Sequence, residues 1–227
     1  MKTKKVLVFA PHPDDDVIGC GGTIIQHVQN GDEVWIVYIT NGEAGSLKIA
    51  PEELAKLRIT EATAAATVLG VPKDHLQFLG WPDGYLEYNP TTLKKMTSLI
   101  RKCQPDTVYL HHEKDLHVDH RVTFRLVTEA VERAAGNCFS ECGKVPWNVE
   151  NVYGYEVWRP MGYVQLVVDI SAEIDQKLRA LAEHRSQLAE LQYDEAVKSL
   201  NHYRAIMTHR GQFAECFQVV KITHEIV

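Results

Sequence analysis

The sequence lacks three features that would each point to a class of protein. Its apolar runs fall well short of the roughly 20 residues that a membrane-spanning helix needs. Beyond the N-terminal lysines it has no basic cluster, and its formal net charge is −6, so it carries no electrostatic footprint for nucleic acid. Its five cysteines are odd in number and scattered, unlike a disulfide framework. We therefore expect a cytoplasmic protein with a small-molecule partner, binding neither nucleic acid nor a membrane.

What the sequence does contain is a regular alternation of short apolar runs and longer segments. Its 227 residues are 45% hydrophobic and 24% charged, a balance that suits a single domain over residues 1–227. Continuous apolar runs predict strands at 6–10, 34–39, 75–79, 106–110, 151–157 and 163–170. Proline and glycine boundaries predict helices at 17–29, 51–70, 90–102 and 119–135. This order predicts an α/β, Rossmann-like fold, with a mostly parallel sheet and helices on both faces.

The C-terminal part is predicted to be a helical extension. One helix is expected from Ser171 to about Glu190 and a second from Asp194 to about His209, before a terminal strand at 217–222. The stretch 137–150, which holds Cys138 and Cys142, is the longest irregular segment. Because a long loop inside a compact domain is often functional, we expect it to lie where it could cover a site.

Two clusters of histidine and aspartate each follow a predicted strand. Residues 11–16 read Pro-His-Pro-Asp-Asp-Asp after the first strand, and residues 111–120 follow the strand at 106–110. Ligands of open parallel sheets bind at the carboxyl ends of the strands, so both clusters should meet at one edge. The three adjacent carboxylates repel one another unless a cation or basic groups lie between them. Two imidazoles and one carboxylate bind catalytic zinc and leave a position open for water, so Zn²⁺ is the predicted cofactor.

Other interpretations of these residues stay open. The same ligand types bind iron in non-haem oxygenases, although those usually have β-rich folds. The glycines at 19–22 suggest a dinucleotide-binding turn, but the spacing is incomplete and the preceding carboxylates would repel a pyrophosphate. A non-catalytic metal-binding module is a further alternative. We expect these glycines instead to let a helix pack closely on the sheet.

The two clusters resemble the signature of the LmbE-like, or PIG-L, N-acetylglucosaminyl deacetylases. The resemblance rests on residues 11–16 with Gly19, Gly21 and Gly22, and on residues 117–120. It extends to residues 40–45, Arg58, 61–62, 69–70, 79–84, 184–187 and 213–217. The chain departs from the family pattern at Pro11, where alanine is usual, and at Asp16, where glutamate is usual.

The resemblance implies a hydrolase that removes an N-acetyl group from an amino sugar or its conjugate. It implies that His12, Asp15 and His120 are the zinc ligands and that Asp14 is the general base. It also implies that His117, in its protonated form, faces the reacting carbonyl and that Asp119 supports the site from outside the ligand shell.

Four further residues are candidates for binding the substrate. Arg58 could bind a hydroxyl or an anionic group, although an exposed helix arginine is the alternative. Asn41, Glu43 and Asp83 lie in predicted strand-end loops and could meet sugar hydroxyls. The sequence does not identify the amine that carries the acyl group in the substrate. Relatives of this size are often oligomeric, which leaves a homo-oligomer open.

Overall fold

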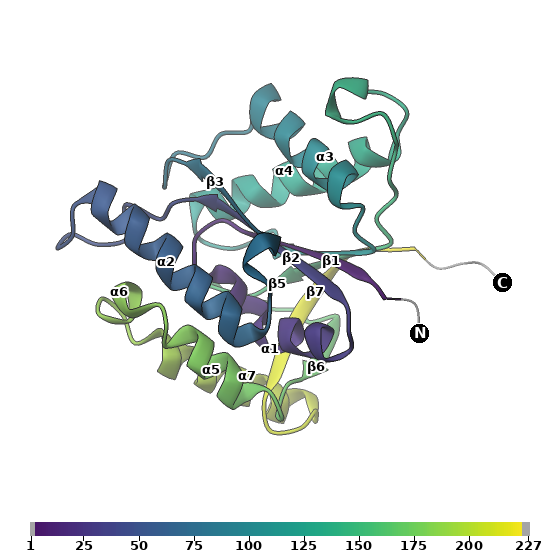
Figure 1. Cartoon of the computed structure of the whole chain (residues 1–227). Helices are drawn as coiled ribbons and strands as arrows, with labels where there is room; N and C mark the ends of the chain where they lie inside the picture. The colour runs from purple at the N-terminus through teal and green to yellow at the C-terminus, as the bar shows by residue number, and fades with distance from the viewer. Residues whose placement is uncertain (1–2, 224–227) are drawn as a thin grey trace.

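A seven-stranded sheet forms the centre of the computed structural model, which describes residues 3–223 (Figure 1). The strands are β1 (Lys5–Ala10), β2 (Glu33–Thr40), β3 (Leu76–Trp81), β4 (Thr107–His111), β5 (Asn151–Tyr155), β6 (Leu166–Asp169) and β7 (Ala214–Ile222). Their order across the sheet is β3-β2-β1-β4-β5-β7-β6. The pairs among β1 to β5 are parallel, and β7 is antiparallel to both of its neighbours. The predicted α/β class with a mostly parallel sheet is confirmed.

Helices cover both faces of the sheet. They are α1 (Asp15–Gln29), α2 (Pro51–Leu69), α3 (Pro90–Cys103), α4 (Val118–Ala135), α5 (Ile174–Leu181), α6 (Arg185–Leu188) and α7 (Tyr193–Thr208), with short 3-10 helices η1 (Lys73–His75) and η2 (Ser140–Cys142). Alternate residues of β1 serve two cores: Val8 packs into the core under α1, α2, α5 and α7, and Phe9 into the core under α3 and α4. Among residues 3–223, no helix combines the length and apolar character that crossing a membrane requires.

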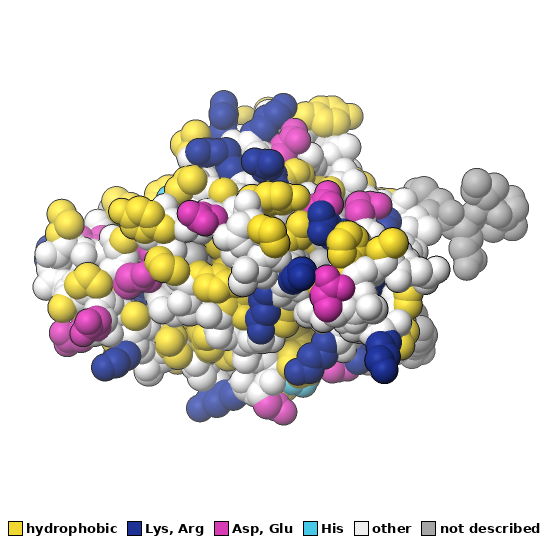
Figure 2. Space-filling view, turned by 90° about the horizontal axis from the view of Figure 1, so that it is seen from above, with side chains coloured by type: hydrophobic (Ala, Val, Ile, Leu, Met, Phe, Trp, Pro, Cys, Tyr) yellow, Lys and Arg dark blue, Asp and Glu magenta, His cyan; other side chains and the backbone are white. Residues whose placement is uncertain are grey.

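The surface mixes side chains of different kinds. On the face seen from above, basic side chains are interspersed with acidic and hydrophobic ones (Figure 2). Charges of the two signs are thus not separated into two areas on this face.

The single helix expected from Ser171 to about Glu190 is wrong, because the chain breaks there into α5 and α6. His184, between the two helices, has φ −81° and ψ 57°, which is not helical. Ser186 then donates hydrogen bonds from its backbone N–H and its hydroxyl to the two carboxylate oxygens of Glu61 on α2, at 2.8 and 2.6 Å. This buried contact draws the start of α6 towards α2, which helix periodicity alone does not reveal.

The stretch 137–150 does not cover the candidate site. It connects the end of α4 to the start of β5, so it lies at the amino edge of the parallel strands. The two clusters of histidine and aspartate lie at the opposite, carboxyl edge. The guanidinium of Arg101 on α3 holds it there by donating to the carbonyl oxygens of Cys138, Phe139 and Gly143. Trp147 anchors the later part of the loop through its indole N–H, which donates to the carbonyl oxygen of Pro105 at 2.7 Å.

Candidate active site

The carboxyl ends of β1, β3 and β4 bring the two predicted clusters together. His12, Asp14 and Asp15 follow β1, Asp83 follows β3, and His117 is the N-cap residue of α4. All five line one cavity of about 370 Å³. The cavity therefore lies where parallel sheets usually bind their ligands.

The three predicted metal ligands lie with their donor atoms face to face. His12 Nδ1 is 3.1 Å from Asp15 Oδ2 and 3.1 Å from His120 Nε2, and the latter two atoms are 3.3 Å apart. Ligands about 2.0–2.2 Å from a tetrahedral zinc ion would be separated by roughly 3.3–3.6 Å. Within residues 3–223, three overlapping groups could hold a metal, and each combines predicted ligands with other residues. They are His12, His117 and His120; His12, Asp83, His117 and Asp119; and Asp15, His111 and His120. The donor set of two imidazoles and one carboxylate and its close spacing fit a zinc ion.

Carboxylates meet the opposite ring nitrogens of both histidines. His120 Nδ1 is 3.0 Å from Asp115 Oδ1. His12 Nε2 is 3.0 Å from Asp83 Oδ1 and 3.3 Å from Asp119 Oδ2. Such contacts fix the orientation of a metal-binding imidazole and raise its basicity. Asp119 thus contacts the ring nitrogen of His12 that faces away from Asp15. Asp115 makes the equivalent contact with His120, and the sequence analysis missed it.

Asp115 is itself held by its surroundings. Its carboxylate accepts hydrogen bonds from the backbone N–H groups of His117 and Trp158, at 3.2 and 3.0 Å. Burial alone would raise its pKa, but the hydrogen bond and charge of His120 keep the pKa of Asp115 well below its usual range. Asp115 is therefore a charged anchor that joins the segment after β5 to the candidate metal centre.

Asp14 forms a buried ion pair with Arg58. Asp14 Oδ2 lies 2.8 Å from Arg58 Nη2, and Arg58 is only 3% exposed. The guanidinium also donates to the carbonyl oxygens of Gly42 and Pro13. Gly42 has φ +65°, and a side chain there would collide with the guanidinium, so this position requires glycine. The alternative of an exposed surface arginine does not hold for Arg58.

The environment of Asp14 suits a general base. Burial raises the pKa of its carboxyl to about 6, against the opposing effect of the nearby Arg58 charge. A base is most effective when its pKa lies near the working pH. Asp14 lines the cavity, and its raised pKa of about 6 is compatible with accepting a proton.

His117 faces the cavity in a form that differs from the expected imidazolium. Its Nδ1 accepts a hydrogen bond from the backbone N–H of Asp119 at 3.2 Å, which assigns the ring proton to Nε2. Burial lowers the pKa of His117, and the charges of His12 and His120 lower it further. The geometry therefore favours a neutral imidazole that donates from Nε2.

The substrate-binding candidates divide into two pairs. Arg58 and Asp83 line the cavity, whereas Asn41 and Glu43 are not among its lining residues. Glu43 instead accepts a hydrogen bond from the backbone N–H of Asp83 at 3.0 Å, behind the site. The cavity is also lined by residues that the sequence analysis did not select, including Trp158, Gln187, Glu190 and Tyr193. They come from segments distant in sequence from the two clusters. Of the four, only Gln187 lies in a segment, residues 184–187, that carries the family resemblance.

The fold and the site define an α/β protein with a candidate mononuclear metal centre at the carboxyl edge of its sheet. The family model for PIG-L, described as GlcNAc-PI de-N-acetylase, matches residues 7–131, more than half of the chain. The chain belongs to the PIG-L family, as the sequence resemblance predicted.

Similar proteins include deacetylases of small sugars. A diacetylchitobiose deacetylase of Thermococcus kodakarensis is 35% identical over 198 residues, which are 82% of this chain and 71% of that protein. The structure of N,N'-diacetylchitobiose deacetylase from Pyrococcus horikoshii, complexed with an inhibitor, shares 31% identity with a TM-score of 0.86, over 96% of this chain and 84% of that one.

The fold by itself does not determine the reaction. GalB, the 4-carboxy-2-hydroxymuconate hydratase from Pseudomonas putida KT2440, has a TM-score of 0.87 at 24% identity, over 99% of this chain and 100% of that one. At this identity the likeness shows the fold alone. The function must therefore be argued from the site.

Proposed function

We propose that this protein is a zinc-dependent hydrolase that removes an N-acetyl group from an amino sugar or an amino-sugar conjugate. The observation that carries the proposal is that His12 Nδ1, Asp15 Oδ2 and His120 Nε2 lie 3.1–3.3 Å from one another, next to the buried carboxylate of Asp14. The names of relatives support the substrate class: they include a diacetylchitobiose deacetylase and deacetylases of 1D-myo-inositol 2-acetamido-2-deoxy-alpha-D-glucopyranoside. The scattered free cysteines support the cytoplasm as the place of action.

His12, Asp15 and His120 would hold the zinc ion. When bound, zinc lowers the pKa of a coordinated water to about 7 and polarises the acyl carbonyl oxygen. Asp83, Asp115 and Asp119 keep the two imidazoles in their ligating orientation through the contacts described above.

The residues beside the metal site then perform the proton transfers. Asp14, ionised and held in place by Arg58, accepts a proton from the attacking water and returns it to the departing amine. His117 donates from Nε2 to the oxygen that gains negative charge as the carbonyl carbon becomes tetrahedral. Arg58 and Asp83 offer a donor and an acceptor to the hydroxyl groups of the sugar.

Release of free amine from N-acetylated sugars tests the proposal. Zinc-loaded protein should release amine from N-acetylglucosamine or diacetylchitobiose, and Asp14→Asn should lower the rate by about 10²-fold or more while retaining zinc. Near-normal turnover of this variant at normal zinc content would remove Asp14 from the mechanism. Activity in the absence of oxygen separates the hydrolase from an iron-dependent oxygenase, and a strict need for oxygen and iron would overturn the proposal.

A further inference from the structure

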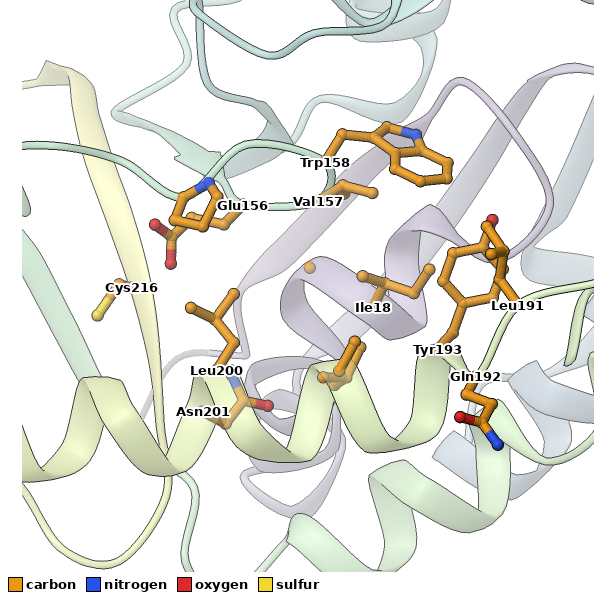
Figure 3. A pocket seen from close by; sticks show the side chains of 14 residues that line it. Ile18, Glu156, Val157, Trp158, Leu191, Gln192, Tyr193, Leu200, Asn201 and Cys216 are labelled. Carbon is orange, nitrogen blue, oxygen red and sulfur yellow. The ribbon is translucent and has the colours of Figure 1, made fainter.

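A second cavity, also of about 370 Å³, lies next to the catalytic one and has no part in the mechanism above. It lies between α7 and the segment that follows β5, as Figure 3 shows. Its lining is mainly hydrocarbon and includes Ile18, Val157, Leu191, Val197 and Leu200. Apolar cavities of this size are typical small-molecule sites.

The buried polar groups Glu156 and Asn201 of this second cavity already have partners. Glu156 pairs with Arg204 and accepts a hydrogen bond from the backbone N–H of Met161. Asn201 binds Lys177 Nζ and the carbonyl oxygen of Ala214. Burial raises the pKa of the Cys216 thiol to about 12, which leaves it unreactive. Most of the cavity lining therefore offers a hydrocarbon surface.

The two cavities share a wall. Ile18, Val157, Trp158 and Tyr193 line both of them. The rings of Trp158 and Tyr193 meet edge to face with centroids 5.7 Å apart. Trp158 is 42% exposed, so its side chain is not locked in the core. The two cavities are therefore neighbours, and these four side chains lie between them.

The catalytic cavity has walls of different polarity. Arg58, Asp83, Gln187 and Glu190 supply polar and charged groups, and they surround the loop at 44–47. Ser46 Oγ donates to Glu190 Oε1 at 2.9 Å, which ties this loop to the end of α6. The shared wall of Ile18, Val157, Trp158 and Tyr193 is mostly apolar. A bound molecule with one polar and one apolar end is thus oriented by the cavity itself.

An N-acyl amino sugar is such a molecule. Its amide is planar and trans, so the sugar on nitrogen and the carbon chain of the acyl group point in opposite directions. With the sugar hydroxyls at the polar wall, the acyl chain is directed to the shared apolar wall. Resting on the proposed function, we propose that the second cavity is an acyl-chain subsite, so that the enzyme hydrolyses amides of medium-chain fatty acids as well as acetyl amides.

A chain-length series with a cavity-filling variant tests this subsite. Rates of amine release would be compared for glucosamine bearing N-acetyl, N-butanoyl, N-hexanoyl and N-octanoyl groups, and for methyl and octyl glycosides of N-acetylglucosamine. Ala196→Trp places an indole in the cavity from an exposed position of α7, and Ser199→Trp is the matched control on the same helix outside the lining. Thermal unfolding verifies that both variants fold, with Ala196→Leu as a milder replacement.

In the wild type and in Ser199→Trp, kcat/KM should rise by up to roughly fourfold per added methylene of the acyl chain. In Ala196→Trp this gain should disappear, with the rate on the N-acetyl substrate unchanged. Calorimetry with hexanoate and acetate measures binding to the cavity without turnover. Hexanoate should bind more tightly than acetate to the wild type and to Ser199→Trp, but not to Ala196→Trp.

Three results would overturn the subsite: no gain with acyl length, a gain that persists in Ala196→Trp, or a gain confined to the octyl glycoside. The last would assign the cavity to the group on the anomeric carbon. A complete lack of amine release, even from the N-acetyl substrates, would instead refute the proposed function, while hexanoate binding would still decide whether the cavity takes an acyl chain.

Discussion

Lys177 Nζ lies 2.6 Å from Glu215 Oε1, and both side chains are completely buried beneath α1. The helix bends at Cys20, where φ is −145° and ψ is 23°. Lys177 donates to the carbonyl oxygen of Ile18, and Glu215 accepts from the backbone N–H groups of Gly22 and Thr23. The pair thus satisfies backbone groups that the bend frees from the helix. Segments near the C-terminus thereby hold the helix that begins with Asp15.

Replacing Lys177 should destabilise the whole domain. Lys177→Met leaves the charge of Glu215 buried without its partner, which typically costs about 3–5 kcal/mol. Urea unfolding at constant zinc content would measure the loss. Lys198→Met on the exposed side of α7 is the matched control and should stay within about 0.5 kcal/mol of the wild type. Equal stability of the two variants would show that the ion pair does not support the bend.

Asp115 should control the affinity for zinc rather than the chemistry. Asp115→Asn removes the negative charge opposite His120 Nδ1, so zinc affinity should fall by about 10- to 100-fold. Competition with a chelator measures the affinity, and the exposed Asp175→Asn serves as the control. His120→Ala should lose zinc almost entirely. If Asp115→Asn binds zinc as tightly as the wild type, the carboxylate does not tune His120.

The sequence was sufficient to predict the fold class and the edge of the sheet that holds the site, because strand periodicity and strand-end clusters are local signals. The role of Asp115 could not be predicted from such local signals. It depends on the orientation of the His120 ring, whose Nε2 faces Asp15 and whose Nδ1 faces Asp115. The burial of Arg58 depends on Gly42 and Pro13, which approach it only in the folded chain. The position of residues 137–150 depends on Arg101, whose hydrogen bonds to that loop have no sequence signature.

His117 should act as a neutral donor. Because its pKa is lowered below the ordinary value of 6.5, a mechanism that needed the imidazolium would lose rate as pH rises through the acidic range. A neutral donor predicts no such loss near neutrality. His117→Ala should lower kcat by roughly 10²-fold with zinc retained, and the acid side of its pH profile should match that of the wild type. A wild-type kcat/KM that falls steadily from pH 5 to 7 would show that the protonated form is the active one.

Arg58 should set the pH at which Asp14 becomes an effective base. Burial raises the pKa of Asp14 to about 6, and the positive charge of Arg58 opposes this rise. The base must be ionised, so kcat/KM should fall as pH decreases through this region. Arg58→Gln removes the opposing charge, so the pKa of Asp14 should increase and the acid limb should move to higher pH. Arg58→Lys keeps the charge and should move the limb less.

The exposed Arg179→Gln on α5 controls for the loss of one charge elsewhere. The pH dependence of kcat/KM for all three variants at equal zinc content is the measurement. A limb that stays in place in Arg58→Gln, or moves to lower pH, would show that a group other than Asp14 accepts the proton.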